Sequence, residues 1–280
     1  DIEKLHRKMG LSLLNPYEFN SMHTSYQYIV KLSKQLLKIE IFDQFMKQYS
    51  KLHSSMEQFM KEYQSIFKLS ELEKWSLQNM ESSVFQRGIN NDLDSLDDKI
   101  NYKKQLLMAI ATKLGFYIDK KKEDIVKIGC NDKYGWHLYM TKTRSNTMKK
   151  SFQNLTNKEL EFKYKDDLFL TCHVNDIKIV TKGSNFHVDL PMIHQISNEI
   201  ISEQKKLQGL NREMYIHKIE EYYKCYSPLL SDIVSYLGIL DLYSNVAKIS
   251  IENIYYRPEI IDSSSSFISA QELRHPIVEK

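Results

Sequence analysis

Between positions 142 and 198 the sequence groups cations with hydroxyl and amide side chains, which are the groups that bind phosphate. Lysine and arginine neutralise phosphate charge, and Ser and Asn donate hydrogen bonds to phosphate oxygens, without distinguishing one base from another. The candidate residues for binding the phosphates of a nucleic acid are Lys142, Arg144, Lys149, Lys150, Lys182, Ser184, Asn185 and Asn198. Composition alone favours an ordinary solvated surface for the same cluster. The prediction therefore depends on the elements that position these residues.

Other chemistry has weaker support. Lys182-Gly183-Ser184 lacks the upstream glycine of a phosphate-binding loop. Cys172 and His173 are neighbours on a predicted strand and point to opposite faces, so they do not predict a zinc site with the histidines at 187 and 194. Paired carboxylates at 92/94, 97/98 and 166/167 lie in polar runs beside helix starts and turns. We predict no catalytic residue, metal site or cofactor in this chain, and no enzymatic activity of its own.

Composition favours helices and gives little information on partners. Glycine (8) and proline (5) are scarce among the 280 residues, and a hydrophobic content of 42% is sufficient for a core. A formal net charge of +3 is too small to identify a polyanion binder. Three separated cysteines fit an intracellular, reducing compartment, and no apolar run approaches the ~20 residues that span a bilayer. The nucleus, a mitochondrion, a virus factory and the bacterial cytoplasm are not distinguished.

Three stretches have apolar residues in alternating steps of three and four, which is typical of helices packed lengthwise. The first extends from about residue 18 to 67 and is predicted to begin at Asn15-Pro16, where a cap precedes a first-turn proline. The second covers residues 92–114 and the third runs from 190 past 223. Pro228 is expected to end the third helix and to start a short one.

Strands are predicted between the second and third helical stretches. Trp136, Leu138 and Met140 alternate with polar and aromatic residues, a period of two. Further candidates are residues 125–128, 168–174, 177–181 and 186–190, separated by turns rich in Asn, Asp and Gly. The predicted fold class is mainly α, with long antiparallel helices in a bundle and a small inserted antiparallel β-containing region.

Several segments, in this order, resemble landmarks of the MutS family of DNA mismatch-repair proteins. They are residues 1–8 (DIEKLHRK), 86–96 (QRGINNDLDSL), 131–142 (NDKYGWHLYMTK), 237–247 (LGILDLYSNVA), 256–258 (YRP) and 272–279 (ELRHPIVE). Their order across nearly the whole chain is more specific than any single match. The segment 163–189 departs from the pattern of many bacterial members, which leaves the clamp tip undefined.

The resemblance implies a fragment without the family's mismatch-binding and ATPase domains. The expected organisation is 1–117 as the first lever helices, 118–190 as a clamp with a small sheet, 191–248 as returning lever helices, and 249–280 as a linker into an absent ATPase domain. The resemblance supports Lys142 and Arg144 best as DNA contacts, because they follow the matched strand.

The implied function is non-specific binding of the duplex DNA backbone, with the levers coupling the clamp to the ATPase. The implied partners are double-stranded DNA and a second MutS-like subunit in the parent protein, whose ATPase would use ATP and Mg, and no membrane. One alternative is a MutS-like recombination protein that encloses branched DNA. Another is a structural coiled-coil spacer with no role on DNA, which the heptad-like stretches alone would allow.

Overall fold

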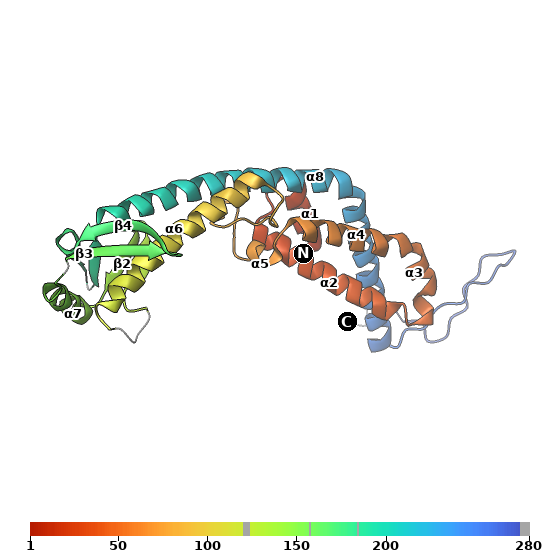
Figure 1. Cartoon of the computed structure of the whole chain (residues 1–280). Coiled ribbons are helices and arrows are strands. Elements are labelled where there is room, and N and C mark those ends of the chain that lie inside the picture. Colours follow the sequence, from red (N-terminus) through yellow and green to blue (C-terminus); the bar gives the residue numbers. More distant parts are fainter. Residues whose placement is uncertain (120–123, 157, 184, 275–280) are drawn as a thin grey trace. The chain divides into compact units, whose positions relative to one another are not determined.

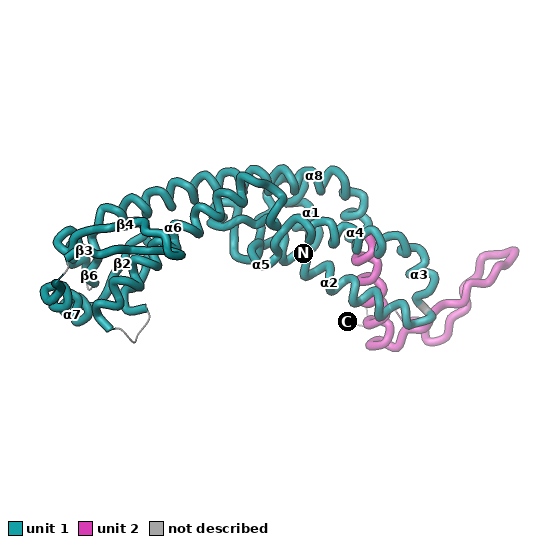
Figure 2. Tube along the Cα trace, viewed as in Figure 1, with its two compact units in different colours: residues 1–234 teal, residues 235–280 magenta. Residues whose placement is uncertain are grey.

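The computed structural model describes residues 1–119, 124–156, 158–183 and 185–274 (Figure 1). Two compact units divide the chain, residues 1–234 and 235–280 (Figure 2). The described part of the chain is mainly helical, with two small antiparallel sheets. No helix within it is long and apolar enough to cross a membrane.

The first half of unit 1 is helical. Its elements are α1 (Ile2–Gly10), α2 (Pro16–Leu36), the 3-10 helix η1 (Glu40–Phe42), α3 (Asp43–Gln48), α4 (Ser50–Ile66), α5 (Leu69–Leu72) and α6 (Asn91–Phe116). As predicted, α2 begins at Pro16, and Glu18 Oε2 accepts hydrogen bonds from the backbone N and Nδ2 of Asn15, both at 3.0 Å. At the start of α6, the Asn90 side chain accepts from the Leu93 N–H at 2.9 Å.

Strands and one further helix lie between α6 and the last helix. In chain order they are β1 (Lys127–Asn131), β2 (Gly135–Met140), α7 (Lys142–Gln153), β3 (Glu159–Tyr164), β4 (Asp167–His173), the 3-10 helix η2 (Val174–Asp176), β5 (Lys178–Lys182), β6 (Asn185–Asp189) and α8 (Pro191–Glu252). One sheet has the order β1-β2-β6-β5, and β3 pairs with β4 in the other. The predicted strands are confirmed to within a few residues, whereas α7 and β3 were not predicted.

Two predicted helical stretches were wrong in their limits. The stretch 18–67 is interrupted after α2 and resumes in α3 and α4, because the apolar periodicity continues across a turn that no Gly or Pro marks. Pro228 lies inside α8 and does not end it. The hydrogen bond that proline cannot donate is outweighed by burial of the following apolar residues, including Leu230 and Ile233.

The helices α6 and α8 run antiparallel beside each other and connect the strands to the helical core (Figure 1). The Lys103 Nζ on α6 lies 3.0 Å from Glu199 Oε2 and 2.8 Å from Glu203 Oε1 on α8. Lys104 lies over the ring of Trp136, and the Trp136 N–H donates to Ser197 Oγ at 2.9 Å. These contacts fix β2 against the paired helices.

An aromatic core joins α2, α4 and the middle of α8. Phe19 packs edge-on against Tyr63, with ring centroids 5.0 Å apart, and Phe59 packs edge-on against Tyr222 at 5.5 Å. All four side chains are fully or almost fully buried. Such edge-to-face pairs add to the hydrophobic stabilisation of the core.

Candidate nucleic-acid interface

The helix α7 places three predicted cations on one solvent-facing surface. Its other face buries Ser145, Met148 and Phe152, which leaves Lys142, Lys149 and Lys150 exposed. The helix contains no Asp or Glu. Across the described ranges, no carboxylate lies within ion-pair distance of these three lysines. We define Lys142, Lys149 and Lys150 as the α7 lysine surface.

Arg144 differs from these lysines because it is half-buried. Its Nη1 donates a hydrogen bond to the carbonyl of Ile125 at 2.9 Å, which ties α7 to the segment before β1. A guanidinium has five N–H donors in a planar fork, so this bond leaves donors for a ligand. Arg144 can therefore act both in the fold and in anion binding.

A pocket of about 390 Å³ brings Arg144 and Asn185 together. It lies between β1, β2, the start of α7 and the start of β6, and its lining residues are Lys127, Tyr139, Met140, Thr141, Arg144 and Asn185. Two cations, a phenol, a hydroxyl and an amide thus surround a space that suits a phosphate group or another small anion. Lys127 and Tyr139 were not predicted as ligands, because only the register that pairs them across β1 and β2 places them together.

The remaining predicted residues are distributed over other elements. Lys182 pairs with Asn185 across the β5-β6 hairpin, and its Nζ lies 4.3 Å from the centroid of the Tyr134 ring. Asn198 is exposed near the beginning of α8, on a different element from the α7 lysine surface. Ser184 lies outside the described residues. The structure thus brings part of the predicted set together around α7 and the pocket.

The Cys and His residues considered for zinc belong to separate elements. Cys172 and His173 lie on β4, in the two-stranded sheet, whereas His187 lies on β6, in the four-stranded sheet. His194 forms a 2.6 Å contact with Asp189 Oδ1. Within the described ranges, no cluster of three or more Cys, His, Asp and Glu side chains has an arrangement that would hold a metal ion.

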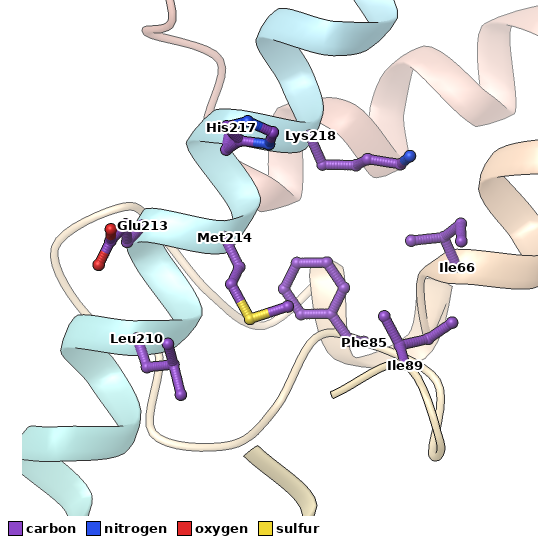
Figure 3. Close-up of a pocket in the computed structure, with 8 residues that line it drawn as sticks. All are labelled: Ile66, Phe85, Ile89, Leu210, Glu213, Met214, His217 and Lys218. Atoms are coloured by element: carbon purple, nitrogen blue, oxygen red, sulfur yellow. The ribbon is translucent and has the colours of Figure 1, made fainter. Parts of the chain in front are cut away.

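A second pocket, of about 320 Å³, is lined by residues of α4, of the segment before α6 and of α8 (Figure 3). In Figure 3 the side chains of Phe85 and Met214 point toward each other, and Ile66, Ile89 and Leu210 complete an apolar lining. Its polar residues, including Glu213 and Lys218, belong to the same helix α8. An apolar lining of this kind offers packing rather than acid-base chemistry.

Comparison with known proteins identifies relatives along the whole chain. A DNA mismatch repair MutS homologue of Acanthamoeba polyphaga mimivirus is 24% identical over 100% of this chain and 25% of its own length. The DNA mismatch repair protein MutS of Thermodesulfovibrio yellowstonii is 23% identical over 100% of this chain and 28% of its own length. That of Lactobacillus johnsonii is 25% identical over 73% of this chain and 20% of its own length.

No family model matches the chain. The chain spans about a quarter of the length of the curated relatives it matches. These matches confirm the resemblance first indicated by the ordered sequence landmarks. The chain is thus a homologue, over its whole length, of part of the MutS DNA mismatch-repair proteins.

Proposed function

We propose that this chain is the lever and clamp part of a MutS-like DNA repair protein and that it binds the duplex backbone without sequence preference. The observation that supports this function best is the α7 lysine surface beside a pocket lined by Lys127, Arg144 and Asn185. Cations and amide donors in this arrangement suit phosphates rather than base edges.

The proposed binding mode has a measurable salt dependence. Each phosphate that a cation neutralises contributes about −0.9 to the slope of log affinity against log salt on duplex DNA. The three lysines of the α7 surface with Arg144 and Lys127 would therefore give a slope of about −4.5 if all five of them contact phosphates. Homoduplex and mismatched duplex are expected to bind equally, because these residues do not contact bases.

The paired helices α6 and α8 supply the proposed lever. They extend from the strands to the aromatic core, and Lys103 links them through Glu199 and Glu203. In a full-length protein we propose that they transmit motion between the clamp and an ATPase that uses ATP and Mg, in an assembly with a second MutS-like subunit. The proposed domain limits are those given by the sequence: 1–117, 118–190, 191–248 and 249–280.

The alternative of a coiled-coil spacer has less support. The spacer hypothesis requires the heptad-like faces to pair between two chains. Here α6 and α8 pair within one chain and are joined through the strands between them. Leu107 and Ile110 of α6 and Ile196 and Ile200 of α8 are buried, so much of the apolar surface of these two helices is already used inside unit 1.

The proposal is tested by fluorescence anisotropy with labelled homoduplex and mismatched duplex at low and moderate salt. The variant Lys142→Glu/Lys149→Glu/Lys150→Glu should lose most of its affinity for both duplexes. The matched control, Lys47→Glu/Lys51→Glu/Lys61→Glu, reverses three exposed charges on α3 and α4 and should bind as the unmodified chain does. Failure to bind duplex at low salt, or equal binding by the α7 variant, would contradict the proposed clamp surface.

A further inference from the structure

One face of the four-stranded sheet displays aromatic rings. Along β2, Leu138 and Met140 are buried on one face, so His137 and Tyr139 belong to the opposite face. The pairing of β2 with β6 places His187 directly across from Tyr139. Tyr134, in the turn before β2, lies with its ring centroid 5.3 Å from that of His187. We name Tyr134, His137, Tyr139 and His187 the ring face.

The rings are packed into a continuous layer. His137 and His187 stack with centroids 4.5 Å apart and an interplanar angle of 8°. Gly129, opposite His137 on β1, makes room for this layer, because a Cβ at that position would lie 2.9 Å from His137 Nε2. His187 is buried at the base of the layer, whereas Tyr134, His137 and Tyr139 remain partly exposed.

Lysines surround the ring face. The Nζ of Lys182 lies 4.3 Å and that of Lys133 5.2 Å from the centroid of the Tyr134 ring. Strand register places Lys127 and Lys178 on the same face, because Lys127 pairs with Tyr139 and Lys178 is two positions from Val180, the partner of His187. The neighbouring carboxylates are Asp132 in the β1-β2 turn and Asp189, which contacts His194. The cations therefore exceed the carboxylates at this surface.

We propose that the ring face binds unpaired bases of a DNA strand. Bases stack on aromatic side chains whatever their sequence, and the surrounding lysines neutralise the phosphates between them. A regular duplex cannot use this surface fully, because its base faces are already stacked inside the helix. An apolar protein partner is less suited to a surface with four lysines at its edge. The inference goes beyond the proposed duplex binding and does not require it.

The pocket beside α7 adjoins this surface. Tyr139 belongs to the ring face and also lines the pocket with Arg144 and Asn185. A phosphate held in the pocket would therefore lie next to a ring on which its own base or a neighbouring base could stack. A DNA junction between duplex and single strand could therefore contact both the pocket and the ring face.

The test compares three labelled probes bound to the 280-residue chain: dT20, an abasic strand of the same length and charge, and a homoduplex. We expect dT20 to bind at least about tenfold more tightly than the abasic strand, because only dT20 can stack. The variant Tyr134→Ala/His137→Ala should bind dT20 about tenfold more weakly, with its affinity for the abasic strand little changed. The variant Tyr134→Phe/His137→Phe retains rings and should retain most of the binding.

A mapping experiment gives an answer even if the alanine variant does not fold. A dT20 strand that contains 5-iodo-deoxyuridine is cross-linked to the unmodified chain by light, and the modified residues are identified by mass spectrometry. Cross-links on Tyr134, His137 or Tyr139 would support the proposal. Equal affinity for dT20 and the abasic strand, or cross-links only on other elements, would overturn it. Loss of duplex binding alone would contradict the proposed clamp surface and leave this inference standing.

Discussion

The helical core and the ring face use the same residue types, Tyr and His, for different purposes. In the core, His6 Nε2 lies 2.7 Å from the Tyr26 hydroxyl and His23 Nδ1 lies 2.8 Å from the Tyr63 hydroxyl, and both pairs are buried. On the sheet, Tyr134, His137 and Tyr139 are partly exposed, and Lys133 and Lys182 lie beside the Tyr134 ring. The surroundings of a ring, and not its type, therefore distinguish a structural contact from a candidate binding surface.

The largest difference should appear in stability. Phe59 is fully buried and contacts Tyr63 and Tyr222, so Phe59→Ala should lower the free energy of unfolding by about 3–5 kcal/mol. Tyr139→Ala, in the ring face, should cost about 1 kcal/mol or less, because part of this side chain already contacts water. Urea titration followed by circular dichroism measures both. Equal losses would remove the distinction between core and surface rings.

The pH dependence of stability should also originate mainly in the core. Burial lowers the pKa of His6 from 6.5 to about 4. Between pH 6.5 and pH 4, His6 is protonated in the unfolded chain but neutral in the folded one. The contribution of His6 to the free energy of unfolding is therefore complete above about pH 6.5 and falls by about 3 kcal/mol as the pH approaches 4. Burial lowers the pKa of His23 in the same direction.

The variant His6→Gln isolates the contribution of this residue. Its free energy of unfolding should change less between pH 7 and pH 4.5 than that of the unmodified chain, when both are measured in urea. The remaining slope would come from the other groups, including His23. A slope unchanged by the substitution would show that His6 is not a source of the pH dependence.

Gly129→Ala tests whether the stack of His137 on His187 supports the ring face. The added Cβ would meet the His137 ring at 2.9 Å and must displace it from the stack. We expect a loss of about 1 kcal/mol in the free energy of unfolding, together with a several-fold weaker affinity for dT20. Gly183→Ala serves as a contrast. Alanine at this position is strained by the backbone φ of +64°, but its Cβ would meet no neighbouring atom, so the ring stack should remain intact. Histidine side-chain NMR shifts follow the stack in both variants.

Arg144→Lys should have the smallest effect. Lysine keeps the positive charge. Its single ammonium cannot replace the planar guanidinium, which can donate to the Ile125 carbonyl and to a phosphate at the same time. Duplex affinity should fall by about twofold to fivefold with an unchanged salt slope. Arg144→Ala removes the charge as well, and its slope should be shallower by about one. An unchanged slope in the alanine variant would mean that Arg144 serves the fold alone.

Sequence predicted those elements whose ends carry a local signal. The start of α2 is marked by Asn15 and Pro16, and the start of α6 by Asn90. The helix α7 was missed because its sequence is strongly polar and buries only a narrow face. The strand β3 was not predicted, although its apolar and polar residues alternate and Leu160 and Phe162 are buried. This alternation is the sequence pattern that could have identified the strand.

The candidate interface was predictable in part. The cations of α7 follow directly from the sequence, because one short helix brings them together. The contributions of Lys127 and Tyr139 depend on which strands pair and in what register, which a single sequence does not specify. The stack of His137 on His187 joins residues 50 positions apart in the chain. The part of the surface that the sequence did not predict therefore depends on strand pairing between residues far apart in the chain.

The shared ion pair of Lys103 has a mechanical consequence. Its two carboxylate partners, Glu199 and Glu203, are four residues apart on α8, which corresponds to about 6 Å along the helix axis. If α6 shifted along α8 by part of a turn, the ammonium would move away from one carboxylate while it stayed near the other. Separation of the two helices sideways would break both contacts at once. The Lys103 contact therefore allows α6 to slide along α8 but resists the separation of the two helices.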